Sequence, residues 1–266
     1  MGADTKKLRT RIKRVDSTLH LTKAMGLVAS SKMKRANDAM SKGRDYAHAI
    51  AGVVDLLTRC PECAKSPYMA VREPNRTCLV VIAGDRGLAG GYNANVFRLA
   101  KEYAGAEIIP IGKRACERFG GDCRYTETFG YADAMALSRR LCEAFSNAEF
   151  DRLGILCTNY ISMMTQEATV QWILPLERGD AKPTGMLFEP DEATMLATVI
   201  PEYVAGMLIA AARESFASEV AARRCAMDSA GKNAQQMIDD LQLAYNRARQ
   251  GAITQEITEI VAGCGS

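Results

Sequence analysis

The sequence predicts an α/β protein in which a long antiparallel coiled coil of N- and C-terminal helices flanks a Rossmann-like, mostly parallel α/β/α domain. Three observations lead to this fold class: proline-free ends, an apolar repeat along each end, and alternating strand and helix patterns between them. With 266 residues, 48% of them hydrophobic, the chain can form one or two domains with a sizeable core. The expected segments are a helix over 1–60, a joint over 61–76, the α/β domain over 77–201 and a helix over 202–266.

The N-terminal helix is predicted from its apolar repeat. All eight prolines lie between residues 61 and 201, so nothing in the first 60 residues breaks a helix. Steps of four and three residues continue over about seven heptads, which is typical of a coiled-coil seam. The seam consists of Leu8, Ile12, Val15, Leu19, Thr22, Gly26, Ala29, Met33, Ala36, Met40, Gly43, Ala47, Ile50, Val54 and Leu57.

A second seam follows the C-terminal end, where only Arg224 interrupts the spacing. It consists of Val220, Met227, Gly231, Ala234, Ile238, Leu241, Tyr245, Ala248 and Ala252. One seam alone is equally consistent with a helix packed on a larger core. Two matching seams favour pairing of residues 6–57 with residues 205–262 as an antiparallel coiled coil.

The middle of the chain alternates between strand and helix patterns. Short apolar runs predict strands at 77–83, 107–111, 153–157 and 168–174, with helices at 93–103, 113–119 and 131–148 between them. This alternation predicts a mostly parallel sheet. Residues 61–76 and 176–201, rich in proline, glycine and charge, are expected to connect the helices to the domain.

A glycine-rich turn follows the first predicted strand. Its residues are Gly84, Asp85, Arg86, Gly87, Leu88, Ala89, Gly90 and Gly91. The spacing is GxxGxxGG, not the GxGxxG of dinucleotide-binding domains, and no P-loop Gly-Lys-Ser/Thr follows. We therefore expect a tight strand-to-helix crossing in which the glycines permit close packing.

Few residues suit catalysis or metal binding. The two histidines, His20 and His48, both lie on the N-terminal helix. Cys60 and Cys63 have CxxC spacing without a second pair, so a turn with two incidental thiols is favoured over a regulatory pair or a metal site. We expect no active site, no metal and no cofactor. The nine cysteines, with no secretory signal and no stretch of eighteen apolar residues, indicate free thiols in a reducing compartment and no membrane span.

Positive charge is concentrated at the N-terminus. Residues 1–44 contain twelve Lys or Arg and three Asp, although the whole chain has a net charge of only +3. Such a helix could follow nucleic-acid phosphates or face an acidic protein surface. Composition alone leaves these two kinds of partner level.

Several motifs together resemble one family. The segments 21–25 (LTKAM), 84–93 (GDRGLAGGYN), 164–169 (MTQEAT), 240–250 (DLQLAYNRARQ) and 253–261 (ITQEITEIV) are similar, in the same order, to the gamma subunit of rotary F-type ATP synthase. The resemblance runs from residue 6 to the end, and the C-terminal motif is the most specific part. The chain departs from the family in having Cys264 after Gly263 and a shorter middle domain, and we see no equivalent of the regulatory cysteine insertion of chloroplast members.

The resemblance implies a function for each part. The helices would form the asymmetric shaft inside a ring of alternating alpha and beta subunits, and the Rossmann-like domain would be a foot contacting the epsilon subunit and the c-subunit ring. The shaft would couple proton flow to ATP synthesis without an active site of its own, on the cytoplasmic face of the bacterial cell membrane, touching the membrane only through the complex. A basic coiled-coil protein that binds nucleic acid is the alternative.

The same resemblance implies contact residues. Arg223, Arg249 and Gln250 match family positions that contact an acidic loop of a beta subunit, and Lys23 and Met25 lie in the N-terminal motif. Arginine suits this role because its planar fork binds carboxylates through two parallel hydrogen bonds.

Overall fold

The computed structural model describes residues 3–73, 75–179 and 188–263. Two long helices, α1 (Ala3–Thr58) and α5 (Glu192–Gly263), are the first and last elements of the sequence, and the other elements lie between them. The helices between them are two short 3-10 helices, η1 (Pro61–Lys65) and η2 (Pro67–Met69), and α2 (Tyr92–Lys101), α3 (Lys113–Phe119) and α4 (Tyr131–Ser146). The strands are β1 (Thr77–Ile82), β2 (Glu107–Ile111), β3 (Arg152–Tyr160) and β4 (Gln166–Leu174). Each predicted strand and helix is present. Most of the observed ends lie within a few residues of the predicted ones, whereas α5 begins ten residues before the predicted start at 202.

The chain forms two compact units, which we name by their content. The helix-pair unit comprises residues 1–30 and 223–266, and the sheet unit comprises residues 31–222. The sequence predicts a coiled coil that is separate from the α/β domain up to residue 60 and from residue 202. Instead, the sheet unit includes the second half of α1 and the first part of α5.

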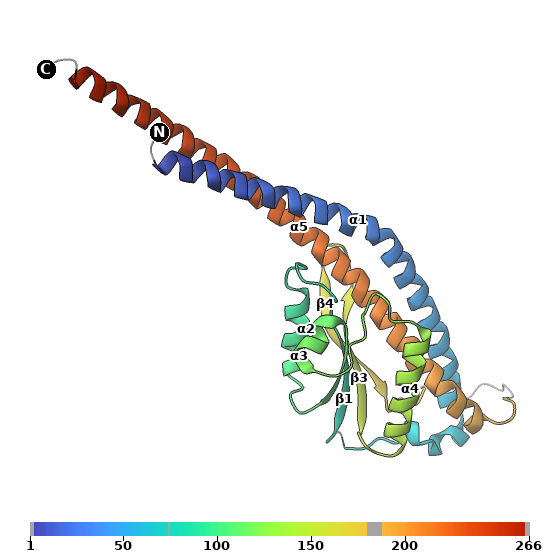
Figure 1. The fold of residues 1–266 in the computed structure, drawn as a ribbon. Helices are drawn as coiled ribbons and strands as arrows, with labels where there is room; N and C mark the ends of the chain where they lie inside the picture. The colour runs from blue at the N-terminus through green and yellow to red at the C-terminus, as the bar shows by residue number, and fades with distance from the viewer. Residues whose placement is uncertain (1–2, 74, 180–187, 264–266) are drawn as a thin grey trace. The chain divides into compact units, whose positions relative to one another are not determined.

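The sheet unit contains a four-stranded sheet of order β2-β1-β3-β4 (Figure 1). The β1–β2 and β1–β3 pairs are parallel, and β4 joins β3 as an antiparallel edge strand. This is the expected mostly parallel sheet. The central strand β1 is buried along almost its whole length, which explains its continuous apolar sequence.

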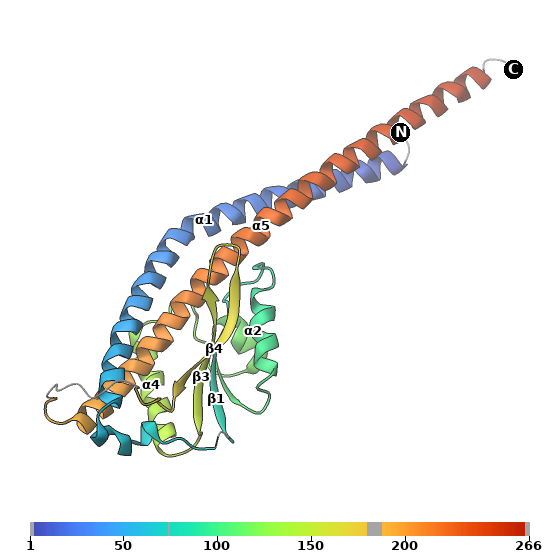
Figure 2. The same cartoon turned by 180° about the vertical axis from the view of Figure 1, so that it is seen from behind.

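Helices cover both faces of this sheet (Figures 1 and 2). On one face, α4, α5 and the end of α1 pack on Cys78, Val80 and Ile82 of β1. On the other face, α2 and α3 pack on Leu79 and Val81. Because successive side chains of β1 point to opposite faces of the sheet, they pack in two apolar cores, one on each face.

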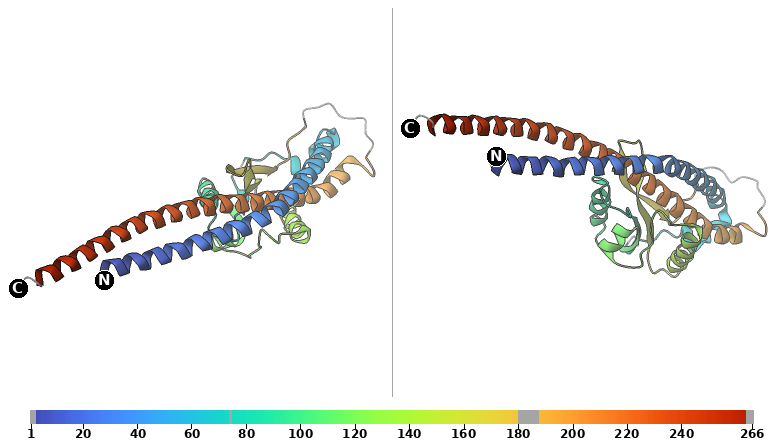
Figure 3. Two further views of the ribbon diagram at one scale, coloured as in Figure 1. Left: turned by 90° about the horizontal axis from the view of Figure 1, so that it is seen from above. Right: turned by 45° about the horizontal axis from the view of Figure 1, so that its top comes forward.

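The helix-pair unit consists of residues 3–30 of α1 running antiparallel to residues 223–263 of α5 (Figure 3). A Cβ atom on Gly26 would lie 3.7 Å from Met227 Cβ, and one on Gly231 would lie 3.7 Å from Thr22 Oγ1. In both units, every predicted seam residue of the two helices is buried or half-buried. The 3.5-residue periodicity therefore predicted the contact face correctly.

The structure differs from the predicted connections in two details. Helix α5 begins at Glu192 and contains Pro201, so residues 192–201, which the sequence places in the second connecting segment, are helical. Burial of Leu196, Ile200 and Val204 against the core outweighs the cost of about 3 kcal/mol for an internal proline. The predicted joint at 61–76 also contributes to the core, because Cys63 of η1 is fully buried.

One stretch of α5 is long and apolar enough to cross a membrane by length and composition alone, although the sequence contains no run of eighteen apolar residues. More than half of this stretch is buried inside the protein. A core helix has the same length and apolar composition, so this feature does not distinguish a membrane span from a packed helix.

Candidate functional site: the helix-pair surface and the polar network of the sheet unit

The helix-pair unit has a narrow apolar core and a strongly charged surface. Leu19, Ala234 and Ile238 form the buried centre, with Ile12 and Val15 packed beside them. Seven basic side chains of α1 in this unit are exposed: Lys6, Lys7, Arg9, Arg11, Lys13, Arg14 and Lys23. Exposed basic side chains on a thin helix pair form a surface suited to an acidic partner.

A groove of about 500 Å³ runs between the two helices of this unit. Gly26 and Gly231 lie along it, and the absence of their side chains contributes to its width. Its charged lining comes from Lys23, Arg224, Asp228 and Lys232, of which the last two form an ion pair at 2.8 Å. Arg224, which interrupts the predicted seam, is thus a lining residue that donates to Ser30 Oγ.

The predicted contact residues are distributed along the unit instead of forming one cluster. Lys23 is exposed and lines the groove, and Met25 is half-buried. On α5, Arg223 is half-buried, whereas Arg249 and Gln250 are exposed. Arg223 and Arg249 are separated by roughly 39 Å of helix at about 1.5 Å per residue, so they can contact different levels of a partner.

Sequence reasoning missed an apolar surface at the end of α5. Four of its side chains are 45–66% exposed: Ile253, Ile257, Ile260 and Val261. With Gly231 opposite Thr22, the antiparallel register places Ala3, the first described residue of α1, near Gln250. The last turns of α5 therefore extend past α1. The continued apolar spacing beyond Ala252 was the signal that could have identified this surface.

In the sheet unit, the glycine-rich turn is a close crossing, as expected. A Cβ atom on Gly84 would lie 2.8 Å from the carboxyl carbon of Glu219, a buried residue of α5. The Arg86 N–H donates to Glu219 Oε1 at 3.3 Å. A protein carboxylate thus lies at the strand-to-helix turn where dinucleotide-binding domains place a pyrophosphate.

Other turn residues have separate structural roles. The Asp85 carboxylate accepts hydrogen bonds from the backbone N–H groups of Lys113, Thr126 and Glu127 at 2.9–3.1 Å. Gly90 has a φ of +57°, a conformation that favours glycine. The remaining glycines of the motif are Gly87, whose Cβ would approach Arg114 at 3.2 Å, and Gly91, which caps α2. The motif thus shapes the turn.

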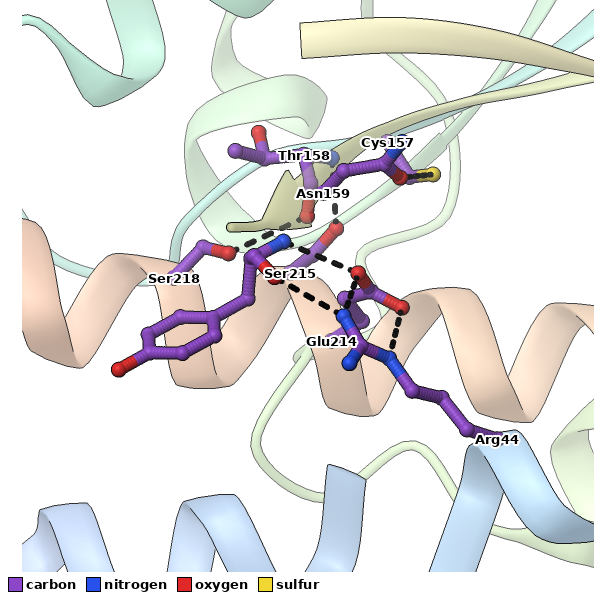
Figure 4. Close-up of polar contacts among 8 residues, drawn as sticks. Arg44, Cys157, Thr158, Asn159, Glu214, Ser215 and Ser218 are labelled. Carbon is purple, nitrogen blue, oxygen red and sulfur yellow. Dashed lines mark hydrogen bonds and ion pairs between the residues drawn. The ribbon is translucent and has the colours of Figure 1, made fainter. Parts of the chain in front are cut away.

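At the end of β3, a polar network joins three elements (Figure 4). Arg44 of α1 donates to both carboxylate oxygens of Glu214 on α5, at 2.6 and 3.1 Å, and to the carbonyl oxygen of Tyr160 at 3.0 Å. The Tyr160 N–H in turn donates to Glu214 Oε1 at 2.9 Å. This hydrogen bonding raises the pKa of the Arg44 guanidinium.

Two serines of α5 extend the same network along β3. The Thr158 N–H donates to Ser215 Oγ at 3.1 Å, and Ser218 Oγ donates to the Thr158 carbonyl oxygen at 3.2 Å. Both serines are fully buried. We call Arg44, Glu214, Ser215 and Ser218 the β3 clamp.

Cys60 and Cys63 are buried at the start of η1. Burial is the main factor that raises the pKa of the Cys63 thiol, to about 11, and its Sγ lies 3.4 Å from the Glu192 carbonyl oxygen. Among the residues that the structure describes, no three His, Cys, Asp or Glu side chains are grouped as metal ligands. That this pair binds no metal stays a prediction, and Cys264 lies outside the described residues.

Comparison with known proteins indicates which family this chain resembles. The ATP synthase family model matches residues 4–266. The ATP synthase gamma chain of Ruminococcus albus is 41% identical over 278 residues, covering 97% of this chain and 96% of the relative.

Solved structures agree on the fold. A chain of the Euglena gracilis mitochondrial ATP synthase matches with a TM-score of 0.67 at 18% identity, covering 98% of this chain and 94% of that one. A chain of the Tetrahymena thermophila central stalk and c-ring structure matches with a TM-score of 0.64 at 23% identity, covering 79% and 99%. From the family model and the bacterial relative, we conclude that this chain belongs to the ATP synthase gamma family, the rotor subunits of the central stalk.

Proposed function

We propose that this chain is the shaft that couples proton flow through the membrane sector to ATP synthesis and hydrolysis in a ring of alpha and beta subunits. The observation that carries the proposal is the helix-pair unit, which has a narrow core, a basic surface and an apolar end that α1 does not cover. Apolar surface of this kind is normally covered by a partner. An asymmetric shaft that contacts each partner conformation differently can bias their equilibrium as it turns.

The two units suggest a division of partners. The helix-pair unit would be enclosed by the alpha and beta subunits, and the exposed end of α5 would lie in an apolar part of the ring. The sheet unit would contact the epsilon subunit and the c-subunit ring. The subunit would then lie on the cytoplasmic face of a bacterial cell membrane and reach the membrane only through the complex.

The polar contacts to the ring would come from Arg223, Arg249 and Gln250 on α5 and from Lys23 on the facing helix, and Met25 would add an apolar contact. Arg249 and Gln250 are exposed near the end of the α1–α5 pairing, where a partner can reach them. Arginine at such a position can bind a carboxylate through two hydrogen bonds. We further propose that the subunit has no active site, cofactor or metal of its own.

The proposal is tested by assembling this chain with its alpha, beta, epsilon and membrane-sector subunits in vesicles. ATP addition should acidify the vesicle lumen, and omitting this chain should abolish that acidification. The double variant Arg249→Ala, Gln250→Ala should reduce assembly or ATP-driven pumping, because losing one partner of a desolvated ion pair costs about 2–5 kcal/mol.

The matched control is Arg98→Ala, which removes an exposed arginine from α2 of the sheet unit. If the double variant assembles and pumps like the control, the assigned contacts are wrong. If the unmodified chain binds DNA at physiological salt and does not assemble with the ring subunits, the rotor proposal itself fails.

A further inference from the structure

The β3 clamp supplies hydrogen bonds that a neighbouring strand would otherwise make. Strand β1 pairs with β3 from Arg152 to Leu156, whereas β3 continues to Tyr160. On the β4 side, β3 remains paired up to Tyr160. On the other side, side chains of α5 bind the main-chain N–H of Tyr160 and both main-chain groups of Thr158. Helix α5 thus takes the place of a strand at this edge.

Arg44 adds α1 to the same point. Its guanidinium contacts Glu214 on α5 and the main chain of β3, so one side chain ties three elements within the sheet unit (Figure 4). The Glu214 side chain is 12% exposed, and hydrogen bonds between partly desolvated charged groups are stronger than neutral ones.

Other α1–α5 contacts in this region are close apolar approaches. A Cβ atom on Gly43 would lie 3.3 Å from the backbone of Ala210, and the Tyr46 ring packs directly over Gly206. Apolar contacts are non-directional, so they do not by themselves define one hydrogen-bonding register. Hydrogen bonds are directional and weaken steeply when the donor angle falls below about 120°. The clamp is therefore a feature that can fix the register between these elements.

We infer that Arg44, Glu214, Ser215 and Ser218 are positioning residues that hold the sheet in one register against the parts of α1 and α5 within the sheet unit, so that rotation is transmitted between the sheet and these helices. This inference rests on the proposed rotor function. It predicts that loosening the clamp lowers the number of protons pumped per ATP hydrolysed more than it lowers hydrolysis itself.

The experiment uses the assembled complex in vesicles with two conservative variants. Arg44→Lys keeps the positive charge and removes the planar guanidinium group that binds both carboxylate oxygens of Glu214. Glu214→Gln removes the negative charge and keeps an oxygen that can accept from the Tyr160 N–H. The control is Glu117→Gln, which breaks an exposed pair with Arg114 inside α3 and joins no separate elements. ATP hydrolysis and ATP-driven acidification are measured on the same vesicles, and hydrogen exchange is followed at the Tyr160 and Thr158 amides.

Both clamp variants should lower the ratio of pumping to hydrolysis several-fold, while the control leaves it unchanged. The Tyr160 amide should exchange about tenfold faster, because a hydrogen bond to a charged group contributes about 1.5–3 kcal/mol. Faster exchange with an unchanged ratio would show that the clamp is only structural, and unchanged exchange would show that it does not hold β3. Both results overturn the inference.

The experiment also distinguishes failure of a variant to assemble from failure of the proposed function. If Arg44→Lys does not assemble, Ser218→Ala, which removes a single neutral hydrogen bond, is judged by the same two measurements. If the unmodified complex hydrolyses ATP without pumping, the proposed function fails, whatever the variants do.

Discussion

The sheet unit and the helix-pair unit bury their side chains to different depths. In the sheet unit, Leu79, Phe145 and Ile155 are completely buried between layers. In the helix-pair unit, the best-buried apolar side chains on α5 keep 6–9% of their surface exposed; they are Met227, Ala234, Ile238 and Leu241. A contact between two helices covers only one stripe of each, whereas a three-layer unit encloses its core. The sheet unit can therefore be stable by itself, and the helix-pair unit depends more on what surrounds it.

Removing a core side chain should produce the largest difference in unfolding free energy between the two units. Phe145→Ala removes a ring that lies 5.8 Å from Phe150 and 6.3 Å from Tyr68, and should lower the free energy of unfolding by about 3–5 kcal/mol. The corresponding change in the helix-pair unit, Ile238→Ala, should cost about 2 kcal/mol, because the buried cluster around Ile238 is narrow. Urea unfolding followed by circular dichroism measures both, and equal losses would contradict the comparison.

Replacing glycine by alanine should have opposite signs in the two units. At Gly84 in the sheet unit, the new methyl group would lie 2.8 Å from the Glu219 carboxyl carbon, so Gly84→Ala should destabilise by about 1–3 kcal/mol. At Gly26 in the helix-pair unit, the nearest atom is Met227 Cβ at 3.7 Å, an ordinary contact. Gly26→Ala should therefore raise helix stability by up to about 1 kcal/mol.

These two variants are compared by thermal unfolding of the complete chain. A higher unfolding temperature for Gly84→Ala, or a lower one for Gly26→Ala, would show that the helix-pair unit, and not the sheet unit, is the tightly packed one.

High pH should weaken the sheet unit first. Burial raises the pKa of the Cys78 and Cys157 thiols from an ordinary value of 9.0 to about 12. Between these values the unfolded thiols lose their protons while the folded ones keep them. Stability is therefore full below pH 9 and falls as pH rises toward 12, by at most about 1.4 kcal/mol per thiol and pH unit.

Burial should also protect these two thiols from chemical modification. At pH 8, iodoacetamide should modify the exposed Cys123 well before Cys78 or Cys157, with mass spectrometry as the measurement. Equal labelling of all three cysteines would mean that the sheet unit opens readily.

The smallest effect is expected on the surface of the helix pair. Asp228 and Lys232 form an ion pair one helical turn apart, and both side chains are more than 60% exposed. Asp228→Asn should leave the urea midpoint unchanged, because solvent already screens both charges. A clear shift of the midpoint would show that the groove charges support the helix pair.

Local patterns predicted most of the elements. The apolar run at 77–82 and the seam from Leu8 to Leu57 each act through near neighbours in the chain, and both appear in the structure. Pro201 does not set the start of α5, because packing of Leu196 and Ile200 in the core extends the helix back to Glu192. The contact residues Arg223, Arg249 and Gln250 came from family resemblance, and they stay a prediction.

By itself, the sequence determined the two long helices, the strand order along the chain and the family, because periodicity and motifs are properties of neighbouring residues. The tertiary structure decided where the compact units divide and which groups meet across long separations. Arg44 and Glu214 are 170 residues apart, and so no local pattern indicates that they share hydrogen bonds with the end of β3. The carboxylate of Glu219 likewise explains Gly84 only once α5 has packed against the turn, since side-chain contact between distant segments exists only in the folded chain.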